Sequence, residues 1–314
     1  KQFDFSVWHG LYRLYTENLE NKITPGYLAF NGLNSTQGLS YNYSNVYKTI
    51  TYLNLFHIGA IDEDTDDTLW NKGYLLPNRN YGMLGASGNP LGDSISIKYQ
   101  RQFAVTKDMI DHHVANFTDP NDVVPSAIEN WPAHGDPNQG QDFYLASFYD
   151  NPNGPNGANG IYDPIVDGDY PKIKGDKAVF SITGLNLGEA DANLPLELHT
   201  MLYYYECNDV LKDVIFASVR VINRSNINMK QVRAGVLSDF DIGGPTDDHA
   251  QTNAELNMVF GFNGDNDDQD FGGMPGMNSD FTSSGTMVLR GVPAKPDMTD
   301  NSVGTGSGEF PYGG

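Results

Sequence analysis

Short runs of β-branched and aromatic residues, each bounded by polar turns, limit the possible folds of this chain more than any other feature. Such runs are typical of β-strands, and their spacing favours packed sheets over alternating strand–helix units. The expected strands are Lys48–Ile61, Lys177–Gly184, Leu196–Glu206, Asp213–Asn223, Val232–Asp241 and Leu256–Phe262. The sequence therefore predicts an all-β fold, a β-sandwich or jelly roll of antiparallel sheets with long Asp/Asn/Gly-rich loops.

Two segments add detail to this prediction. Residues Asp213–Asn223 are apolar on both faces through their centre, as expected of a central strand in a two-sheet packing. Residues Val105–Phe117 are the best helix candidate, because Thr106 can cap the first turn and apolar residues recur behind it. The pair His112 and His113 would lie on the surface of that helix. We expect at most one or two short helices in the fold.

The length of 314 residues allows one large β domain or two ordinary ones. Aromatic residues make up 12% of the chain and bury much area each, so a real core is expected. We expect residues 1–292 to form a single β-rich domain, with two packed subdomains that meet near residues 120–130 as the alternative. Residues 293–314 are Gly-rich and would form a tail or a docking arm.

The charge balance excludes several classes of partner. The chain has 40 acidic and 19 basic residues and a formal net charge of −21, so it repels nucleic acid and anionic membrane surfaces. No apolar run is long enough to predict a membrane span. The charge instead favours divalent cations or a basic partner. The single cysteine, Cys207, excludes an intrachain disulfide and is expected to be a buried packing residue.

Clusters of acidic residues predict a calcium site. Calcium takes about six to eight oxygen ligands from carboxylates, amides and backbone, and Asp and Asn residues with Gly between them supply such ligands. The candidate ligands are Asp150, Asp163, Asp167, Asp169, Asp239, Asp241, Asp247, Asp248, Asp265 and Asp267. No segment matches the strict EF-hand pattern. The alternative is a set of Asx turns with solvated carboxylates, and the run Asp62–Asp67 has the same two interpretations.

Catalytic motifs are lacking. The sequence has no GxSxG, Walker or dinucleotide-binding glycine pattern, and no closely spaced histidine pair that indicates a transition metal. His134, His199 and His249 are each expected to be hydrogen-bonded structural residues. Asp239 and Asp241 lie two residues apart on one side of an expected strand end. Together with Glu197 or Glu206 they form the only carboxylate set that suggests a hydrolase.

Several phrases, read in order, resemble one family. They are "IENWPAHGDPNQGQDFYLASFYD", "NGIYDPIVDGDYPKIKGDKAVF", "LPLELHTMLYYYE", "FASVRVINRS", "DFDIGGPTDDHA" and "NMVFGFNGDNDD". The chain resembles the N-terminal region of Bacteroidota proteins exported by the type IX secretion system, over about Ile58 to Asp270. That resemblance implies a secreted protein of the cell surface. The family's loop commonly carries Asp or Asn where this chain has Pro155 and Gly157, so calcium at this loop is less expected here.

Glycosylation is a further expectation for an exported protein. Sequons place candidate N-glycans at Asn34, Asn42, Asn116 and Asn223. Thr68 in "DTL" and Ser94 in "DSI" resemble the Asp–Ser/Thr–apolar sites of O-glycosylation in exported Bacteroidota proteins.

These observations together predict a non-enzymatic, secreted structural protein of the extracellular cell surface, with Ca²⁺ as its cofactor. Its sharper form is a self-associating filament subunit or an adhesin, in which Lys1–Val7 or Glu309–Gly314 adds to a neighbour's sheet edge. The alternatives are a secreted polysaccharide hydrolase that uses Asp239 and Asp241, and a glycan-binding module.

Overall fold

The structure, a computed structural model, forms two compact units. It describes residues 12–15, 19–23, 27–29, 39–43, 46–51, 53–71, 98–99, 102–185, 196–272, 275–279 and 282–289. Unit 1 contains the described residues within Arg79–Asn186 and Pro195–Ser225, and unit 2 those within Leu11–Asn78 and Asn226–Gly314. Residues 120–130, where the sequence allowed a boundary, lie inside unit 1. Residues 293–314, the expected tail or arm, lie outside the described residues.

The all-β prediction is confirmed, because the described strands pair in antiparallel sheets with only short helices beside them. The finer prediction of a sandwich or jelly roll stays a prediction. In the described ranges no helix has the length and apolarity that a membrane-crossing helix needs.

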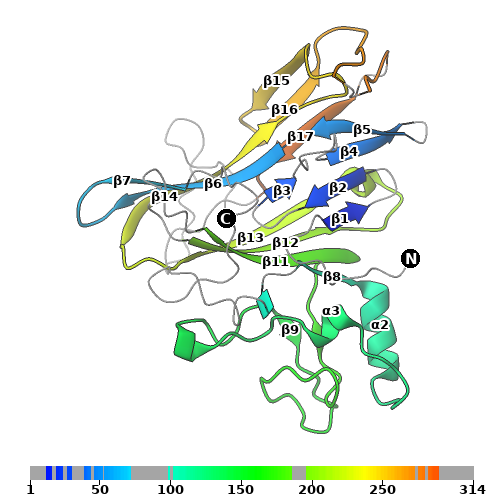
Figure 1. Cartoon of the computed structure of the whole chain (residues 1–314), viewed down its shortest axis with the longest axis vertical. Coiled ribbons are helices and arrows are strands. Elements are labelled where there is room, and N and C mark those ends of the chain that lie inside the picture. Colours follow the sequence, from blue (N-terminus) through cyan, green and yellow to red (C-terminus); the bar gives the residue numbers. More distant parts are fainter. Residues whose placement is uncertain are drawn as a thin grey trace. The chain divides into compact units, whose positions relative to one another are not determined.

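Unit 1 is built on a four-stranded sheet in the order β13-β12-β11-β8 (Figure 1). Its strands are β8 (Gln102–Thr106), β11 (Lys177–Leu185), β12 (Leu196–Tyr204) and β13 (Phe216–Asn223). A small pair joins β9 (Phe148–Tyr149) to β10 (Tyr170–Pro171). The helices are α2 (Lys107–Asn116), α3 (Ser126–Glu129) and the 3-10 turns η2 (Pro137–Gln139) and η3 (Val210–Asp213).

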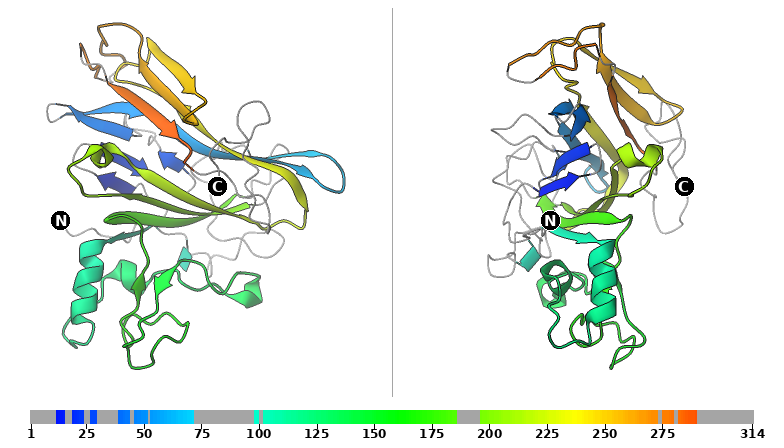
Figure 2. Two further views of the ribbon diagram at one scale, coloured as in Figure 1. Left: turned by 180° about the vertical axis from the view of Figure 1, so that it is seen from behind. Right: turned by 90° about the vertical axis from the view of Figure 1, so that its right-hand side faces the viewer.

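The core of unit 1 lies between this sheet and the segment that carries α2, α3 and β9, which packs on one sheet face (Figure 2). Trp131 is at its centre: its ring meets Phe103 of β8 edge-on at 6.0 Å and Phe180 of β11 at 5.2 Å. Ile128 and Ile182 are fully buried beside them. The core therefore joins the sheet to the segment in which the Asp-rich loop begins.

Unit 2 contains three antiparallel sheets, in the orders β1-β2-β4-β5, β14-β6-β3 and β15-β16-β17, with β7 also paired to β6. The first contains β1 (Tyr12–Tyr15), β2 (Leu19–Ile23), β4 (Leu39–Tyr43) and β5 (Val46–Thr51). The second contains β3 (Tyr27–Ala29), β6 (Leu53–Asp62), β7 (Thr68–Asn71) and β14 (Met229–Asp239). The third contains β15 (Asp248–Asn253), β16 (Met258–Asn263) and β17 (Ser283–Met287).

Some local predictions are confirmed and others are wrong. Thr106 does cap α2, accepting a hydrogen bond from the Met109 N–H at 3.1 Å. His113, expected on the surface of that helix, is fully buried, because α2 packs this side toward the Asp-rich loop. The expected strand Lys48–Ile61 is two strands, β5 and β6. Residues Asp213–Asn223, expected to form a central strand, contain β13, which is the terminal strand of its sheet among the described residues, so the central position was wrong.

Candidate functional site

The Asp-rich loop of unit 1, defined here as residues 150–169 and called the Asp loop, contains the first group of predicted calcium ligands. Their carboxylates accept hydrogen bonds from the loop's own backbone. Asp169 Oδ1 accepts from the Asn151 N–H and Oδ2 from the Asp163 N–H, both at 2.8 Å. Asp167 Oδ1 accepts from the Asn156 N–H at 2.9 Å, and Oδ2 from the same residue's side-chain amide at 3.2 Å. The carboxylates therefore replace the backbone partners that a sheet would have supplied.

The remaining carboxylates of the Asp loop follow the same rule. Asp150 accepts from the N–H groups of Asn159 (3.1 Å) and Gly160 (2.6 Å), and Asp163 from those of Ile165 (3.1 Å) and Val166 (2.9 Å). The Asn and Gly residues of the loop form tight turns, and these turns direct the N–H groups toward the carboxylates. Gly168 has a φ of 71°, and a Cβ there would lie 2.7 Å from the Phe117 ring.

Burial distinguishes the two innermost carboxylates. Asp167 is 1% exposed and Asp169 is 0% exposed. Burial raises the pKa of Asp169 above its ordinary value, while its two backbone N–H donors act in the opposite direction. His113 of α2 donates from Nε2 to the Asp169 carbonyl oxygen at 3.0 Å, and burial lowers the pKa of this imidazole. The helix is thus tied to the inner end of the Asp loop by a neutral histidine.

A second histidine supports the outer part of the loop. His134 Nε2 faces the Tyr162 N–H at 2.9 Å, and since a backbone N–H only donates, Nε2 is the acceptor. The proton therefore sits on Nδ1, which donates to the Phe143 carbonyl at 3.2 Å. Tyr162 in turn donates its hydroxyl to the Ile128 carbonyl at 2.6 Å. The sequence expectation of a hydrogen-bonded structural histidine did not include these partners, which are far apart in the chain.

The predicted ligands Asp239, Asp241, Asp247 and Asp248, together with Asp268, form a second group in unit 2, called the acidic corner. Asp239 ends β14 and is exposed, whereas Asp241 is only partly exposed. Asp248 Oδ2 accepts from the Ile242 N–H at 2.7 Å, but its Oδ1 is buried and accepts no hydrogen bond from the described residues. Asp247 Oδ2 is likewise buried and accepts no hydrogen bond from the described residues. This corner therefore holds carboxylate oxygens that the described backbone does not satisfy.

The electrostatics of the corner follow chiefly from burial and from neighbouring carboxylates. Burial, followed by the negative charge of Asp239, raises the pKa of Asp241 to about 6. Burial also raises the pKa of Asp248 to about 7; the nearby carboxylates Asp268, Asp241 and Asp247 add to it, and the Ile242 N–H opposes it. These carboxylates consequently repel one another when ionised at neutral pH.

Asp268 is the innermost residue of the corner, and the sequence did not single it out. It is 0% exposed and accepts from the Gly244 N–H at 2.8 Å and the Met277 N–H at 2.6 Å. Burial raises its pKa. The predicted ligands Asp265 and Asp267 belong to an exposed turn, in which Asp265 accepts from the Asp267 N–H at 2.7 Å. The run "NGDNDDQD" therefore contains one buried acid among exposed ones.

Neither group converges as a calcium site built from side chains would. Within the described residues, no three His, Cys, Asp or Glu side chains are placed to share a metal ion. In the Asp loop the carboxylate oxygens already accept hydrogen bonds, which leaves fewer lone pairs for a cation. In the acidic corner, Asp247 Oδ2 and Asp248 Oδ1 are free of such bonds from described residues and are hard oxygen donors of the kind calcium prefers. The corner fits a calcium ion better than the Asp loop does.

The carboxylates considered for hydrolysis occupy different environments. Glu197 of β12 is fully buried; its Oε1 accepts from His199 Nε2 and Arg224 Nη2, each at 2.8 Å. Burial raises the pKa of Glu197, but these two hydrogen bonds outweigh it and lower the net value. Glu206 pairs with Lys177 near the surface. Neither residue belongs to unit 2, in which Asp239 and Asp241 lie.

Two further predictions concern surface residues. Cys207, expected to be a buried packing residue, is partly exposed after the end of β12, and its Sγ lies 3.0 Å from Asp209 Oδ1, so that prediction is wrong.

Of the glycosylation candidates, Thr68 and Asn223 are exposed and Asn116 is partly exposed at the end of α2. Asn34 and Ser94 lie outside the described residues, as does the side chain of Asn42.

Comparison with known proteins adds no relative: no family model, no curated protein and no solved structure matches this chain.

Proposed function

We propose that this chain is a non-enzymatic, secreted structural protein of the cell surface that is stabilised by calcium and associates with copies of itself. The observation that carries the proposal is how the acidic side chains are used. In the Asp loop they accept hydrogen bonds from the backbone of a long loop, and in the acidic corner partly buried carboxylates lie close enough to raise one another's pKa. Both arrangements serve architecture, and the repulsion in the corner is what a bound cation would relieve.

The resemblance to exported Bacteroidota proteins supports the location at the cell surface. Its test is labelling of intact cells with an antibody raised against the chain, with a cytoplasmic protein as the control. Labelling only after the cells are opened would contradict a surface location.

Calcium would be held at the acidic corner by Asp247 and Asp248 together with backbone carbonyl oxygens. Bound calcium would neutralise carboxylates whose ionisation burial disfavours. We expect a chelator to lower the melting temperature and added Ca²⁺ to restore it. The matched pair of variants is Asp248→Asn in the corner and Asp163→Asn in the Asp loop. Only Asp248→Asn should abolish the response, and an unchanged melting temperature after chelation of the natural chain would exclude calcium as a stabiliser.

A secreted polysaccharide hydrolase is the second candidate, because a carboxyl group with a pKa of about 6 or about 7 is suited to general acid catalysis. If this were the function, the chain would release reducing ends from a polysaccharide, and Asp241→Asn would stop it. We expect no release with the natural chain. Activity that is lost in Asp241→Asn but kept in Asp265→Asn would replace the structural proposal.

A further inference from the structure

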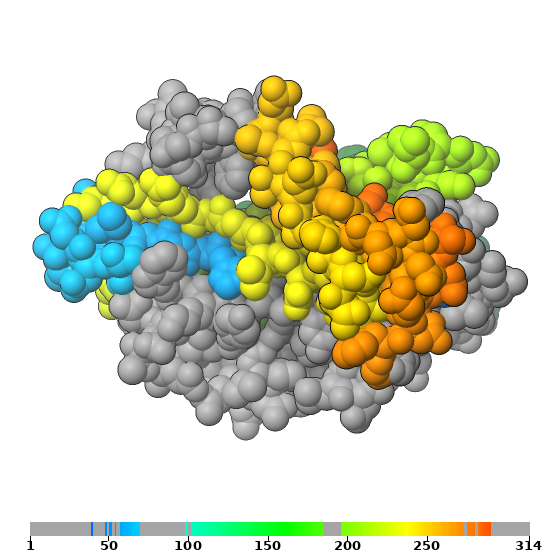
Figure 3. Space-filling view, turned by 90° about the horizontal axis from the view of Figure 1, so that it is seen from above, coloured from blue at the N-terminus to red at the C-terminus, as the bar shows by residue number. Residues whose placement is uncertain are grey.

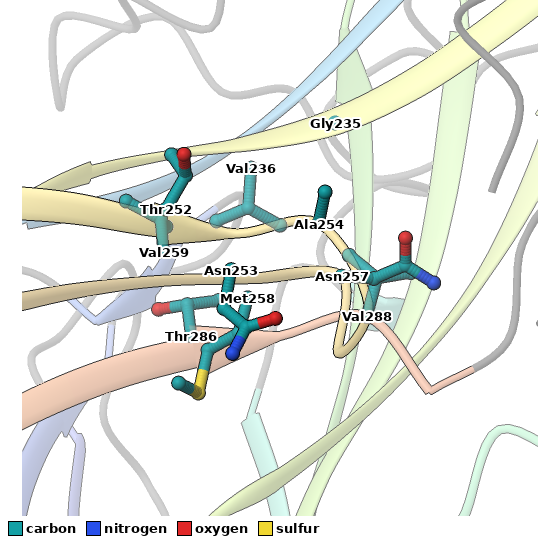
Figure 4. A pocket seen from close by; sticks show the side chains of 10 residues that line it. All are labelled: Gly235, Val236, Thr252, Asn253, Ala254, Asn257, Met258, Val259, Thr286 and Val288. Carbon is teal, nitrogen blue, oxygen red and sulfur yellow. The ribbon is translucent and has the colours of Figure 1, made fainter. Parts of the chain in front are cut away.

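A pocket lies in unit 2 between β14 and the end of the β15-β16-β17 sheet (Figure 4). Its volume is about 270 Å³. The lining residues are Gly235, Val236, Thr252, Asn253, Ala254, Asn257, Met258, Val259, Thr286 and Val288. Sites for drug-sized ligands usually measure about 300–1,000 Å³. This pocket is therefore of the size that takes one side chain rather than a large ligand.

The pocket exists because the two sheets separate at this point. Ser238 of β14 donates to Thr286 Oγ1 of β17 at 3.0 Å, so the strands are in contact there. Val236, two residues before Ser238, and Val288, two residues after Thr286, both line the open space. Gly235 adds to it, since a Cβ at this position would meet no atom within 4 Å. Valines and a bare glycine give the pocket an apolar wall.

Next to the pocket, β14 has an open edge. It pairs with β6 along one side, and no described strand pairs with the other side. The exposed residues of this strand include Val232 and Leu237, at 41% and 43%. An edge strand that exposes apolar side chains is a template for strand addition unless it is protected. The bulge between Lys230 and Arg233 interrupts only the strand's beginning.

A polar side chain also lines the pocket. The side-chain nitrogen of Asn257, in the turn between β15 and β16, is buried and has no hydrogen-bond partner among the described residues. An open strand edge beside an apolar pocket suits an extended polypeptide that places one apolar side chain in the pocket. Figure 3 shows β14 and the β15–β17 sheet as one continuous surface in yellow to orange.

We infer that this site binds residues Glu309–Tyr312 of a second copy of the chain. In an extended segment Phe310 and Tyr312 lie on the same face, so one ring can enter the pocket while the other packs on the rim. The segment has one charge, Glu309, which suits the exposed Arg233 on β14. A contact of this kind limits repulsion between two chains of net charge −21. When each copy's segment enters the site of the next copy, the assembly is head-to-tail, and when two copies exchange their segments it is a closed dimer.

This inference rests on the self-association in the proposed function, and the test separates the two. Sedimentation velocity of the full chain over a range of concentrations should show oligomers. Gly235→Leu should weaken association at least tenfold, because its side chain fills the pocket. The leucine enters open space, and Gly235 is not in the left-handed region, so the fold should tolerate it. Phe310→Ala should have the same effect. Gln251→Leu, which adds a leucine on exposed β15 outside the pocket, is the matched control and should associate like the natural chain.

A synthetic peptide of residues 304–314 gives an independent measurement. It should bind the natural chain, lose binding to Gly235→Leu, and dissociate the oligomers when in excess, while the same peptide with Phe310→Ala should do none of these. Melting curves of each variant confirm that it is folded. If the chain associates but Gly235→Leu and Phe310→Ala leave association unchanged, the inference is overturned and self-association stands. A chain that remains monomeric at every concentration overturns both.

Discussion

The Asp loop of unit 1 and the acidic corner of unit 2 both gather aspartates, and burial raises the pKa of a carboxylate in each, but they differ in how their carboxylates are hydrogen-bonded. In the Asp loop each of the carboxylates has hydrogen-bond donors, chiefly backbone N–H groups. In the acidic corner Asp248 has a donor at only one oxygen, and other carboxylates surround it. The difference teaches that Asp and Gly content alone does not define a metal site. What matters is whether the local turns direct N–H groups or other carboxylates at each oxygen.

The largest expected effect comes from removing the inner carboxylate of the Asp loop. Asp169 is fully buried, and Asp169→Ala leaves the partly buried N–H groups of Asn151 and Asp163 without this acceptor. Each unsatisfied buried group costs about 1–3 kcal/mol, so the free energy of unfolding should fall by about 3 kcal/mol. Denaturant titration followed by tryptophan fluorescence measures this loss, since Trp131 lies in the core of the same unit.

The control for this comparison is Asp265→Ala in unit 2, which removes a single acceptor in an exposed turn. Its effect should stay within about 0.5 kcal/mol. Equal losses in the two variants would show that the buried hydrogen bonds of the Asp loop have no special part in stability.

A smaller effect of opposite sign is expected in the acidic corner. Asp248→Asn keeps an oxygen for the Ile242 N–H and removes the charge that repels Asp241 and Asp268. Solvent partly screens that repulsion, so the chain should gain about 1 kcal/mol in the absence of calcium. Thermal melting in a chelating buffer measures it. The matching change in the Asp loop, Asp169→Asn, should destabilise, because an amide cannot accept at both positions; two changes of the same sign would remove the contrast.

The antiparallel β fold could be predicted from the sequence because runs of β-branched and aromatic residues are typical of strands. The sequence also identified the acidic segments and the Thr106 cap. It could not show that Asp167 and Asp169 are buried while Asp265 is exposed, since all three stand in similar Asp- and Gly-rich surroundings. Burial there depends on α2 and His113, which lie far from the loop in the chain.

The pocket beside β14 escaped prediction for a similar reason. Gly235 is one of many glycines, and only the separation of two sheets gives it a role. The same limit applies to His113, which the helix pattern assigned to the surface because the pattern contains no information about what packs on α2. The sequence therefore predicts local features such as strands and helix caps, but it does not predict which distant residues pack against a given side chain.

The smallest expected effect is a difference in pH response between the two units. Burial keeps His113 neutral in the folded chain, whereas the unfolded chain takes up that proton near the ordinary pKa of 6.5. The contribution of His113 to the stability of unit 1 should therefore be lost as the pH falls below that value, and the raised pKa of Asp169 acts in the opposite direction. Asp241 and Asp248 behave in the opposite way: the folded chain takes up protons near pH 6 and pH 7, and the unfolded chain does so only near the ordinary value of 3.8. Unit 2 should gain stability over the same interval.

Hydrogen exchange detected by mass spectrometry can separate the units, provided that protection factors are corrected for the intrinsic effect of pH. Between about pH 7.5 and about pH 5.5, protection should fall in peptides from the Asp loop and rise in peptides from residues 240–248. His113→Phe should remove the first change and Asp248→Asn should reduce the second. Parallel changes in both peptides would mean that one common transition governs the pH response. The contrast between satisfied and repelling carboxylates would then be a local feature without its own thermodynamic signature.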